Sequence, residues 1–382
     1  MLLVVGIVGI ALNLRPSLTG VGPLIADIRQ DTGLSSALLG LLTTLPLLAF
    51  GVVSALTPLL TRRLGLERAL GVALAALAVG VLIRGAPSVL VLYLGTTLLG
   101  TAIAFGNVLL PSIVKRDFPH RTGSMTSLYS SAMGVGATIG AGVSVPLALW
   151  LGWRGALAVW SIPAMIAFLL WLPQMHDATP PEPSRGIRES LRHLGTSTLA
   201  WHVALFMGLQ SLTFYVVIAW LPEILQSRGL DAGYAGWMLA LSQATGILGT
   251  IIIPTWAGRL RHQRSVVIYL GLLEAVSLAG MLIPNNTIVP IWVSLLGFIL
   301  GGTFGLALLF IVLRTDDTDT ATELSGMAQS IGYLIAAVGP IVFGWIYDLV
   351  QGWTAPILFL VLTMLAKVAT GVGAGRAQRI GQ

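Results

Sequence analysis

The chain has 382 residues, of which 55% are hydrophobic and only 9% charged, with a net charge of +6 and a mean hydropathy of +0.89. Soluble domains carry about a quarter charged residues, so this composition indicates a membrane protein with many spans. The absence of cysteine excludes disulfides, thiolate metal sites and a cysteine nucleophile. Because the basic residues stand between apolar runs, where they set membrane topology, we discard nucleic-acid binding.

Apolar runs of about 20 residues predict an all-α polytopic membrane protein with twelve transmembrane helices. In chain order the runs are Leu2–Ile28, Ser36–Leu60, Ala69–Ile83, Val89–Pro111, Ser124–Leu149, Arg154–Leu172, Leu199–Leu221, Gly233–Ala257, Val266–Ile283, Ile288–Leu313, Leu324–Leu349 and Thr354–Val372. Met1 opens directly into apolar sequence, so we expect the first run to be a retained helix and not a cleaved leader.

The centre of the first run carries an arginine, Arg15, in the stretch ALNLRPSLTGVGP. An arginine at bilayer depth is costly and normally faces a protein interior or a water-filled cavity. Pro16 cannot donate a hydrogen bond to the carbonyl of Leu12, and the glycines that follow loosen the next turns, so we expect a kinked helix. Arg15 is therefore the first candidate for solute binding. The alternative is a structural pair with a carbonyl or carboxylate.

The loop charges predict the orientation. With the N-terminus in the cytoplasm, fifteen of the 21 lysines and arginines fall in cytoplasmic connections. Four lie on the opposite side, namely Arg29, Arg84, Arg154 and Arg228, and Arg15 and Lys367 lie inside helices. By the positive-inside rule, both termini are expected in the cytoplasm of a bacterium, with the chain in its inner membrane.

The longest connection, residues 173–198, divides the chain into two predicted six-helix bundles, residues 1–172 and 199–382. Several short motifs recur between them at offsets of 196 to 200 residues, although dipeptide matches also arise by chance. They are Gly33-Leu34 and Gly229-Leu230, Gly40 and Gly236, Phe105-Gly106 and Phe304-Gly305, and Gly152-Trp153 and Gly352-Trp353. Parallel six-helix repeats are typical of major facilitator transporters, whose solute binds near the midplane between the halves.

Several long segments carry a family resemblance, among them ALNLRPSLTGVGPLIADI, GNVLLPSIVKRDFPHRTGSMTSLYS and ELSGMAQSIGYLIAAVGPIVFG. They resemble the cyanate and 2-nitroimidazole permease family of the major facilitator superfamily. The resemblance implies the twelve-helix fold and transport of a small polar or anionic solute, without fixing the solute. One departure is Arg62, which stands where the superfamily usually has an aspartate in the loop after the second helix. Glu67, together with the basic residues around it, is the candidate for an ion pair that closes the cytoplasmic side in place of this aspartate.

The resemblance also implies that helices 1, 4, 7 and 10 line the cavity, with helices 2, 5, 8 and 11 beside them. The polar residues on these helices are the candidate solute ligands: Arg15, Asn107, Tyr129, Gln210, Tyr215, Gln243, Gln329 and Tyr333. Arginine offers a planar fork of donors, which favours a cyanate-, nitro- or carboxylate-like solute. For each amide the alternative is a hydrogen bond between helices.

Three further residues are candidates for coupling or gating. Lys115 lies at the cytoplasmic mouth, Glu274 near mid-depth and Asp27 toward the outer rim. Proton-driven carriers use buried carboxylates as relays, but Glu274 is on a helix expected to be peripheral, where a structural role is the alternative. The histidines show no metal-ligand spacing, so we expect neither a metal nor a cofactor.

The sequence thus predicts a monomeric secondary active transporter in the lipid bilayer, which moves its solute by alternating access. The sequence does not distinguish uptake from efflux, nor does it assign coupling to protons. A proton-coupled efflux pump for drugs or nitro compounds is therefore an alternative. A membrane-embedded enzyme would need a nucleophile with a base or a metal cluster, and a sensor would add a signalling domain. Neither pattern is visible in the sequence.

Overall fold

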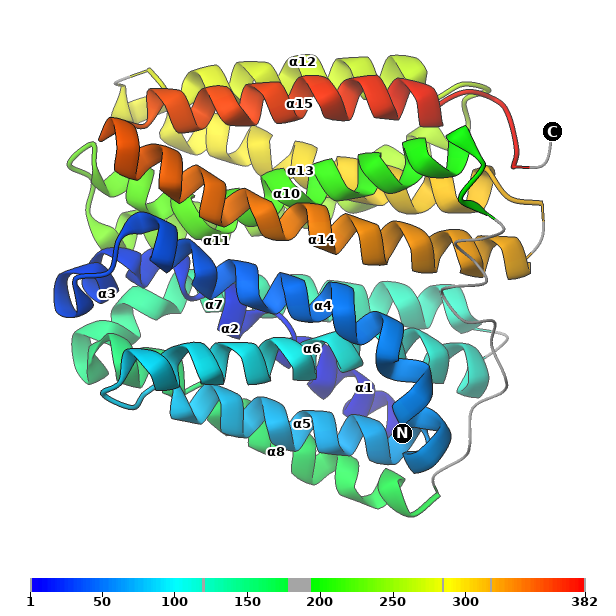
Figure 1. Cartoon of the computed structure of the whole chain (residues 1–382), viewed down its shortest axis with the longest axis horizontal. Helices are drawn as coiled ribbons and strands as arrows, with labels where there is room; N and C mark the ends of the chain where they lie inside the picture. Colours follow the sequence, from blue (N-terminus) through cyan, green and yellow to red (C-terminus); the bar gives the residue numbers. More distant parts are fainter. Residues whose placement is uncertain (1, 119–120, 178–193, 284, 317, 381–382) are drawn as a thin grey trace.

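The computed structural model describes residues 2–118, 121–177, 194–283, 285–316 and 318–380. Every regular element within these ranges is a helix, which confirms the all-α fold. Figure 1 shows two groups of helices side by side, with α1 to α8 in the lower group and α10 to α15 in the upper group. The predicted linker, residues 173–198, lies largely outside the described residues, so its boundaries stay a prediction.

The first group has a broken first crossing followed by five more. Its elements are α1 (Leu2–Asn13), α2 (Pro16–Thr19), η1 (Gly22–Leu24), α3 (Ile25–Thr32), α4 (Ser36–Leu64), α5 (Leu66–Ile83), α6 (Val89–Asp117), α7 (Thr122–Ala158), α8 (Ser161–Trp171) and η3 (Leu172–Asp177). The predicted kink after Arg15 is confirmed, since four short helices replace one continuous helix. α7 spans parts of two crossings, because Gly152, whose φ is +68°, kinks it: the fifth crossing ends at this kink, close to the predicted Leu149, and the sixth begins just after it.

The second group consists of six crossings. Its elements are α10 (Thr198–Gln226), α11 (Ala232–Ala257), α12 (Arg264–Gly280), η4 (Asn286–Ile288), α13 (Val289–Leu313), α14 (Thr318–Val350) and α15 (Thr354–Ala374). Across the described ranges, 10 helical segments are long and apolar enough to cross a membrane. The other two crossings are α12, with 17 residues, and the sixth crossing, in which the part of α7 after Gly152 continues into α8; they complete the predicted twelve.

The two groups meet along two equivalent seams, where α4 packs on α14 and α7 packs on α11. One pair of repeated glycines, Gly40 and Gly236, lies at these seams. A Cβ on Gly40 would meet the carbonyl oxygen of Pro340, and a Cβ on Gly236 would meet that of Ala141. Only glycine lets the backbones approach so closely. The repeat therefore has a physical basis, because both copies provide contact between the halves.

Candidate solute-binding site

The break in the first crossing determines where Arg15 lies. α1 ends at Asn13, and the carbonyl of Arg15 accepts hydrogen bonds from the amides of Leu18 and Thr19, both at 3.0 Å. The Thr19 hydroxyl donates to the carbonyl of Ala137 on α7 at 2.9 Å. Arg15 thus stands at the start of a short helical turn that is anchored to α7.

The Arg15 side chain reaches from the first half to α10 in the second. Its Nη1 donates a hydrogen bond to the Tyr215 hydroxyl at 2.8 Å, across 200 residues of sequence. The guanidinium carbon lies 5.9 Å from the ring centroid of Phe214 and 6.0 Å from that of Tyr215, within cation–π range. The side chain is half-buried. No ion pair involving Arg15 occurs among the described residues, so its charge faces neutral groups.

A second tyrosine approaches the same guanidinium from α14. Tyr333 lies within electrostatic range of both Arg15 and Tyr215. Its ring packs edge-on against Phe50 of α4, with the centroids 5.2 Å apart. The structure therefore brings together three of the predicted ligands, Arg15, Tyr215 and Tyr333, from three different helices.

The remaining predicted ligands divide by whether their polar atoms are already bonded. Gln210 is buried, and its amide nitrogen donates to the Met207 carbonyl at 3.1 Å and the Ser211 hydroxyl at 2.6 Å on its own helix. Gln329 donates to Ser325 at 3.0 Å, also within one helix. These bonds occupy both amide hydrogens of Gln210 and one of the two of Gln329.

Asn107 on α6 differs from these glutamines, because its amide nitrogen is buried and has no hydrogen-bond partner in the part of the chain that the structure describes. The preceding Gly106 packs against Leu14, so this part of α6 lies beside the helix break. Tyr129 is half-buried and its side chain interacts with Thr126 and Ser130 of its own helix. Gln243 is buried within α11.

The coupling candidates lie apart from Arg15. Glu274 of α12 is fully buried and pairs with Lys367 of α15, whose Nζ lies 2.7 Å from Oε1 and 2.5 Å from Oε2. These two helices lie at the edge of the molecule farthest from the first half (Figure 1). Asp27 is exposed on α3, and the side chain of Lys115 lies outside the described residues.

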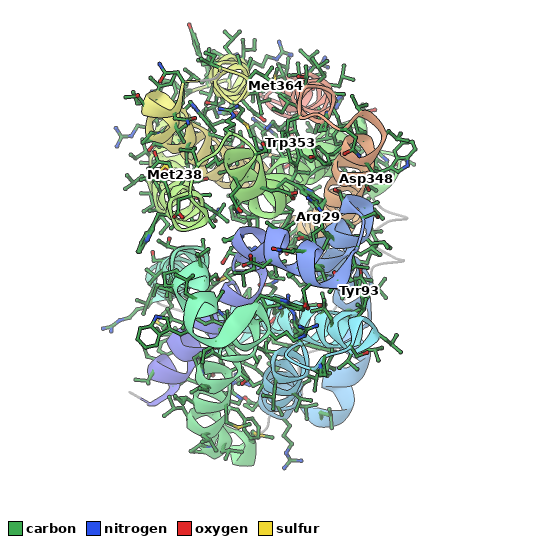
Figure 2. The ribbon with its side chains drawn as sticks, turned by 90° about the vertical axis from the view of Figure 1, so that its left-hand side faces the viewer. Arg29, Tyr93, Met238, Asp348, Trp353 and Met364 are labelled. Atoms are coloured by element: carbon green, nitrogen blue, oxygen red, sulfur yellow. The ribbon has the colours of Figure 1, made fainter. Side chains whose placement is uncertain are left out.

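Polar contacts close the seam at the end of the crossings where α3 meets α4, which the loop charges predict to be the outer end. Arg29 of α3 forms an ion pair with Glu223 of α10 and donates to the Ser36 hydroxyl at 2.7 Å. Asp348 of α14 accepts from the amides of Ser36 and Ala37 at 3.0 and 2.8 Å, so its charge caps the N-terminus of α4. Figure 2 shows Arg29 and Asp348 where the two halves meet.

At the other end of the crossings, Glu67 pairs with Arg116 at 2.6 Å, and Arg116 also bonds to Asp117 at 2.8 Å. The hydrogen bonds that the Arg116 guanidinium donates to the Asp117 and Glu67 carboxylates raise its pKa above the usual value. The sequence suggested the basic residues around Glu67 as its partners, whereas the ion pair seen among the described residues is with Arg116 of α6. However, this pair joins α5 to α6 within one half and does not bridge the two halves.

The sequence predicts Arg84 in the connection after α5, and the structure places it at the start of that connection but with its side chain buried. Arg84 caps the end of α5 but is fully buried, and its Nη1 donates to the carbonyl of Ser17 at 2.9 Å. Arg15 is therefore not the single cation inside the protein, since Arg84 and Lys367 are also buried. No motif marks Arg84, because the carbonyl that it contacts becomes available only through the break in the first crossing.

Comparison with known proteins identifies the family. The family model of the Major Facilitator Superfamily matches residues 2–337. The chain belongs to this superfamily. It is 41% identical to the 2-nitroimidazole transporter of Escherichia coli K12, covering 99% of this chain and 96% of that relative. It is 31% identical to the cyanate transport protein CynX of the same organism, covering 89% and 88%. The resemblance to this permease family is thus confirmed.

A third relative and a solved structure agree with this assignment. The uncharacterized transporter YycB of Bacillus subtilis 168 is 43% identical, covering 100% of this chain and 95% of that relative. A crystal structure of the nucleoside transporter NupG superposes with a TM-score of 0.79 at 13% identity, covering 98% of this chain and 99% of that one. At this identity the likeness establishes the fold alone. The superfamily member described here is a multi-pass membrane transporter.

Proposed function

We propose that this transporter moves a small, flat, polar or anionic solute, which Arg15 binds near the middle of the membrane. The observation that carries the proposal is the half-buried Arg15 guanidinium, whose described contacts are a tyrosine hydroxyl and aromatic rings. A cation inside the membrane without a carboxylate partner is favourable only where an anion or strong acceptor compensates it. The planar guanidinium fork matches carboxylate, nitro and cyanate groups.

The aromatic surroundings favour a flat solute. Phe214 and Tyr215 pack edge to face with centroids 5.2 Å apart, and Tyr333 lies near the same guanidinium. Aromatic rings bind flat, polarisable groups well by offset or edge-on packing. The relative named for 2-nitroimidazole, a ring that carries a strong acceptor, supports this choice.

Alternating access fits the contacts at the outer seam. The Arg29–Glu223 pair and the Asp348 cap hold the two halves together there. We infer that these contacts must separate for the site to reach the outer side. A solute bound by Arg15 from one half and by Tyr215 and Tyr333 from the other would draw the halves together at the midplane. The cycle is proposed for a monomer in a bacterial inner membrane.

A thermal-shift screen of matched compounds tests the solute class. We expect 2-nitroimidazole, benzoate or cyanate to raise the melting temperature of the purified protein as their concentration passes Kd. Imidazole, benzamide and chloride are the controls, since each lacks the nitro group, the carboxylate or the cyanate geometry. If only cationic or neutral lipophilic compounds stabilise the protein, the proposed solute class is wrong.

The orientation is tested separately from the solute. The chain has no cysteine, so single cysteines at Ala377 and Asn286, both exposed, can report on one side each. In intact cells an impermeant thiol reagent should label the Asn286→Cys variant, whereas the Ala377→Cys variant should require lysis. Labelling of both from the same side would contradict cytoplasmic termini.

A further inference from the structure

We propose that Arg84 is a positioning residue for the solute site, which holds the break in the first crossing so that Arg15 faces the second half. This inference rests on the proposed role of Arg15 and extends it to a residue that does not contact the site itself. Arg84 lies at the end of α5, whereas Arg15 precedes α2.

The burial of Arg84 needs an explanation because it is costly. The side chain is fully buried, and its Nε and Nη2 atoms have no hydrogen-bond partner among the described residues. A buried guanidinium without a carboxylate is less stable than an apolar side chain of similar volume. Gly95 of α6 leaves room for the Arg84 side chain because it has no side chain of its own. A Cβ at this position would lie 2.9 Å from Cγ of Arg84. A cation kept in such a place is more consistent with a functional role than with stability alone.

Within the described ranges the Arg84 side chain makes one hydrogen bond, to a carbonyl that the helix break has freed. In a continuous helix the Ser17 carbonyl would accept from the amide of Val21, four residues later. Here the Val21 amide bonds to Leu18 at 3.3 Å, and Arg84 donates to Ser17 at 2.9 Å in its place. Buried backbone groups need a partner, so Arg84 stabilises the broken conformation against the continuous helix.

The short helix α2 is thus held from two sides. Arg84 bonds to Ser17 from α5, and Ala137 of α7 accepts from Thr19. Arg15 precedes this turn and accepts two of its backbone hydrogen bonds. Loss of the Arg84 contact frees one of the two attachments, and the Arg15 guanidinium then loses its fixed position beside Tyr215.

The test compares Arg84→Met with a matched variant in the other half. Arg228 also donates one hydrogen bond to a backbone carbonyl, that of Ile283 at 3.1 Å, but lies outside the solute site. The purified full chain carries Arg84→Met, Arg84→Lys or Arg228→Met. Two measurements are made on each variant: amide hydrogen exchange over residues 14–24 without ligand, and affinity for 2-nitroimidazole.

We expect Arg84→Met to speed amide exchange in residues 14–24 and to weaken 2-nitroimidazole binding about tenfold. This is the effect of one charge-assisted hydrogen bond between Arg15 and the ligand, which is lost when Arg15 is no longer held in position. Arg84→Lys keeps a charged donor and should lie between the wild type and Arg84→Met in both measurements. Arg228→Met should change neither. If Arg84→Met does not fold, the same graded result is required of Arg84→Lys.

Unchanged exchange over residues 14–24 in both Arg84 variants would overturn the proposal, whatever the ligand result. Faster exchange with wild-type affinity would also overturn it, because Arg84 would then hold the backbone without positioning Arg15. Failure of the proposed function has a different signature: Arg15→Ala itself would bind 2-nitroimidazole normally. The exchange data still decide whether Arg84 holds α2.

Discussion

Two cations inside the membrane, Arg15 and Lys367, look alike in the sequence but have opposite surroundings in the structure. Lys367 is buried against the carboxylate of Glu274, with both oxygens within 2.7 Å of its Nζ. Arg15 meets a hydroxyl and aromatic rings, and it remains partly accessible. The charge of Lys367 is therefore already neutralised, whereas that of Arg15 is available to a ligand.

The comparison separates structure from function within one membrane protein. A fully desolvated ion pair between α12 and α15 fixes which helices pack together, and it has little capacity left for a solute. A proton relay through Glu274 would first have to break this pair, so the structural alternative is favoured for it. The cation of Arg15 faces a neutral hydroxyl acceptor and aromatic rings, which leaves its charge to be compensated by a solute.

The largest effect is expected at Arg15. Arg15→Ala should abolish solute binding in a folded protein, and Arg15→Lys should weaken it, since lysine keeps the charge but loses the planar fork. A charge-assisted hydrogen bond contributes about 1.5 to 3 kcal/mol, which corresponds to at least about tenfold in Kd. Calorimetric titration with 2-nitroimidazole measures the loss, and Arg154→Ala, which removes an ion pair with Asp31, is the control. A folded Arg15→Ala protein that binds normally would show that the two cations do not differ.

The reverse pattern is expected for Lys367→Met. Removing one partner of a buried pair leaves Glu274 uncompensated, which costs about 3 to 5 kcal/mol of stability. Thermal or denaturant unfolding measures this loss, while the affinity of the protein that remains folded should not change.

The control for this prediction is the double variant Glu274→Leu with Lys367→Met. Because both charges are replaced by apolar side chains, it should recover most of the stability. Loss of solute binding or transport in a stable double variant would reassign the pair from structure to coupling.

The sequence predicted the fold and part of the site because the signals for both are local. Apolar length, Pro16 and the loop charges are read directly from the chain, and they gave the crossings and the kink. Arg15 was found because its burial follows from its place in an apolar run. Arg84 was missed because its burial depends on packing among α2, α5 and α6, and the Glu274–Lys367 pair joins residues 93 apart.

Glu223→Gln is expected to have an intermediate effect. It should change how often the outer seam between the two halves opens, without changing the surroundings of Arg15 or Lys367. The Arg29–Glu223 pair is partly exposed, so its loss should cost about 1 kcal/mol, or about fivefold in the fraction of molecules with an open outer seam. A cysteine in place of Thr44, which is buried and bonds to Ala337 across the seam, reports this opening by its labelling rate. Asp31→Asn removes an ion pair within one half and should leave the rate unchanged. Equal labelling in both variants would exclude Glu223 from the outer gate.

The smallest effect is expected for Asn107→Leu. It tests whether the contrast between groups with and without a partner inside the protein extends from the two cations to neutral amides. Asn107 has a buried nitrogen without a partner beside the helix break, whereas the nitrogen of Gln210 is bonded within its own helix. A neutral hydrogen bond contributes about 0.5 to 1.5 kcal/mol, so Asn107→Leu should weaken 2-nitroimidazole binding by a few-fold. Gln210→Leu is the matched control, since its loss affects bonds inside α10 and should change the melting temperature more than the affinity. If the two variants lose affinity equally, then an unsatisfied donor is no guide to the ligand here, and the same inference at Arg15 would rest on its charge alone.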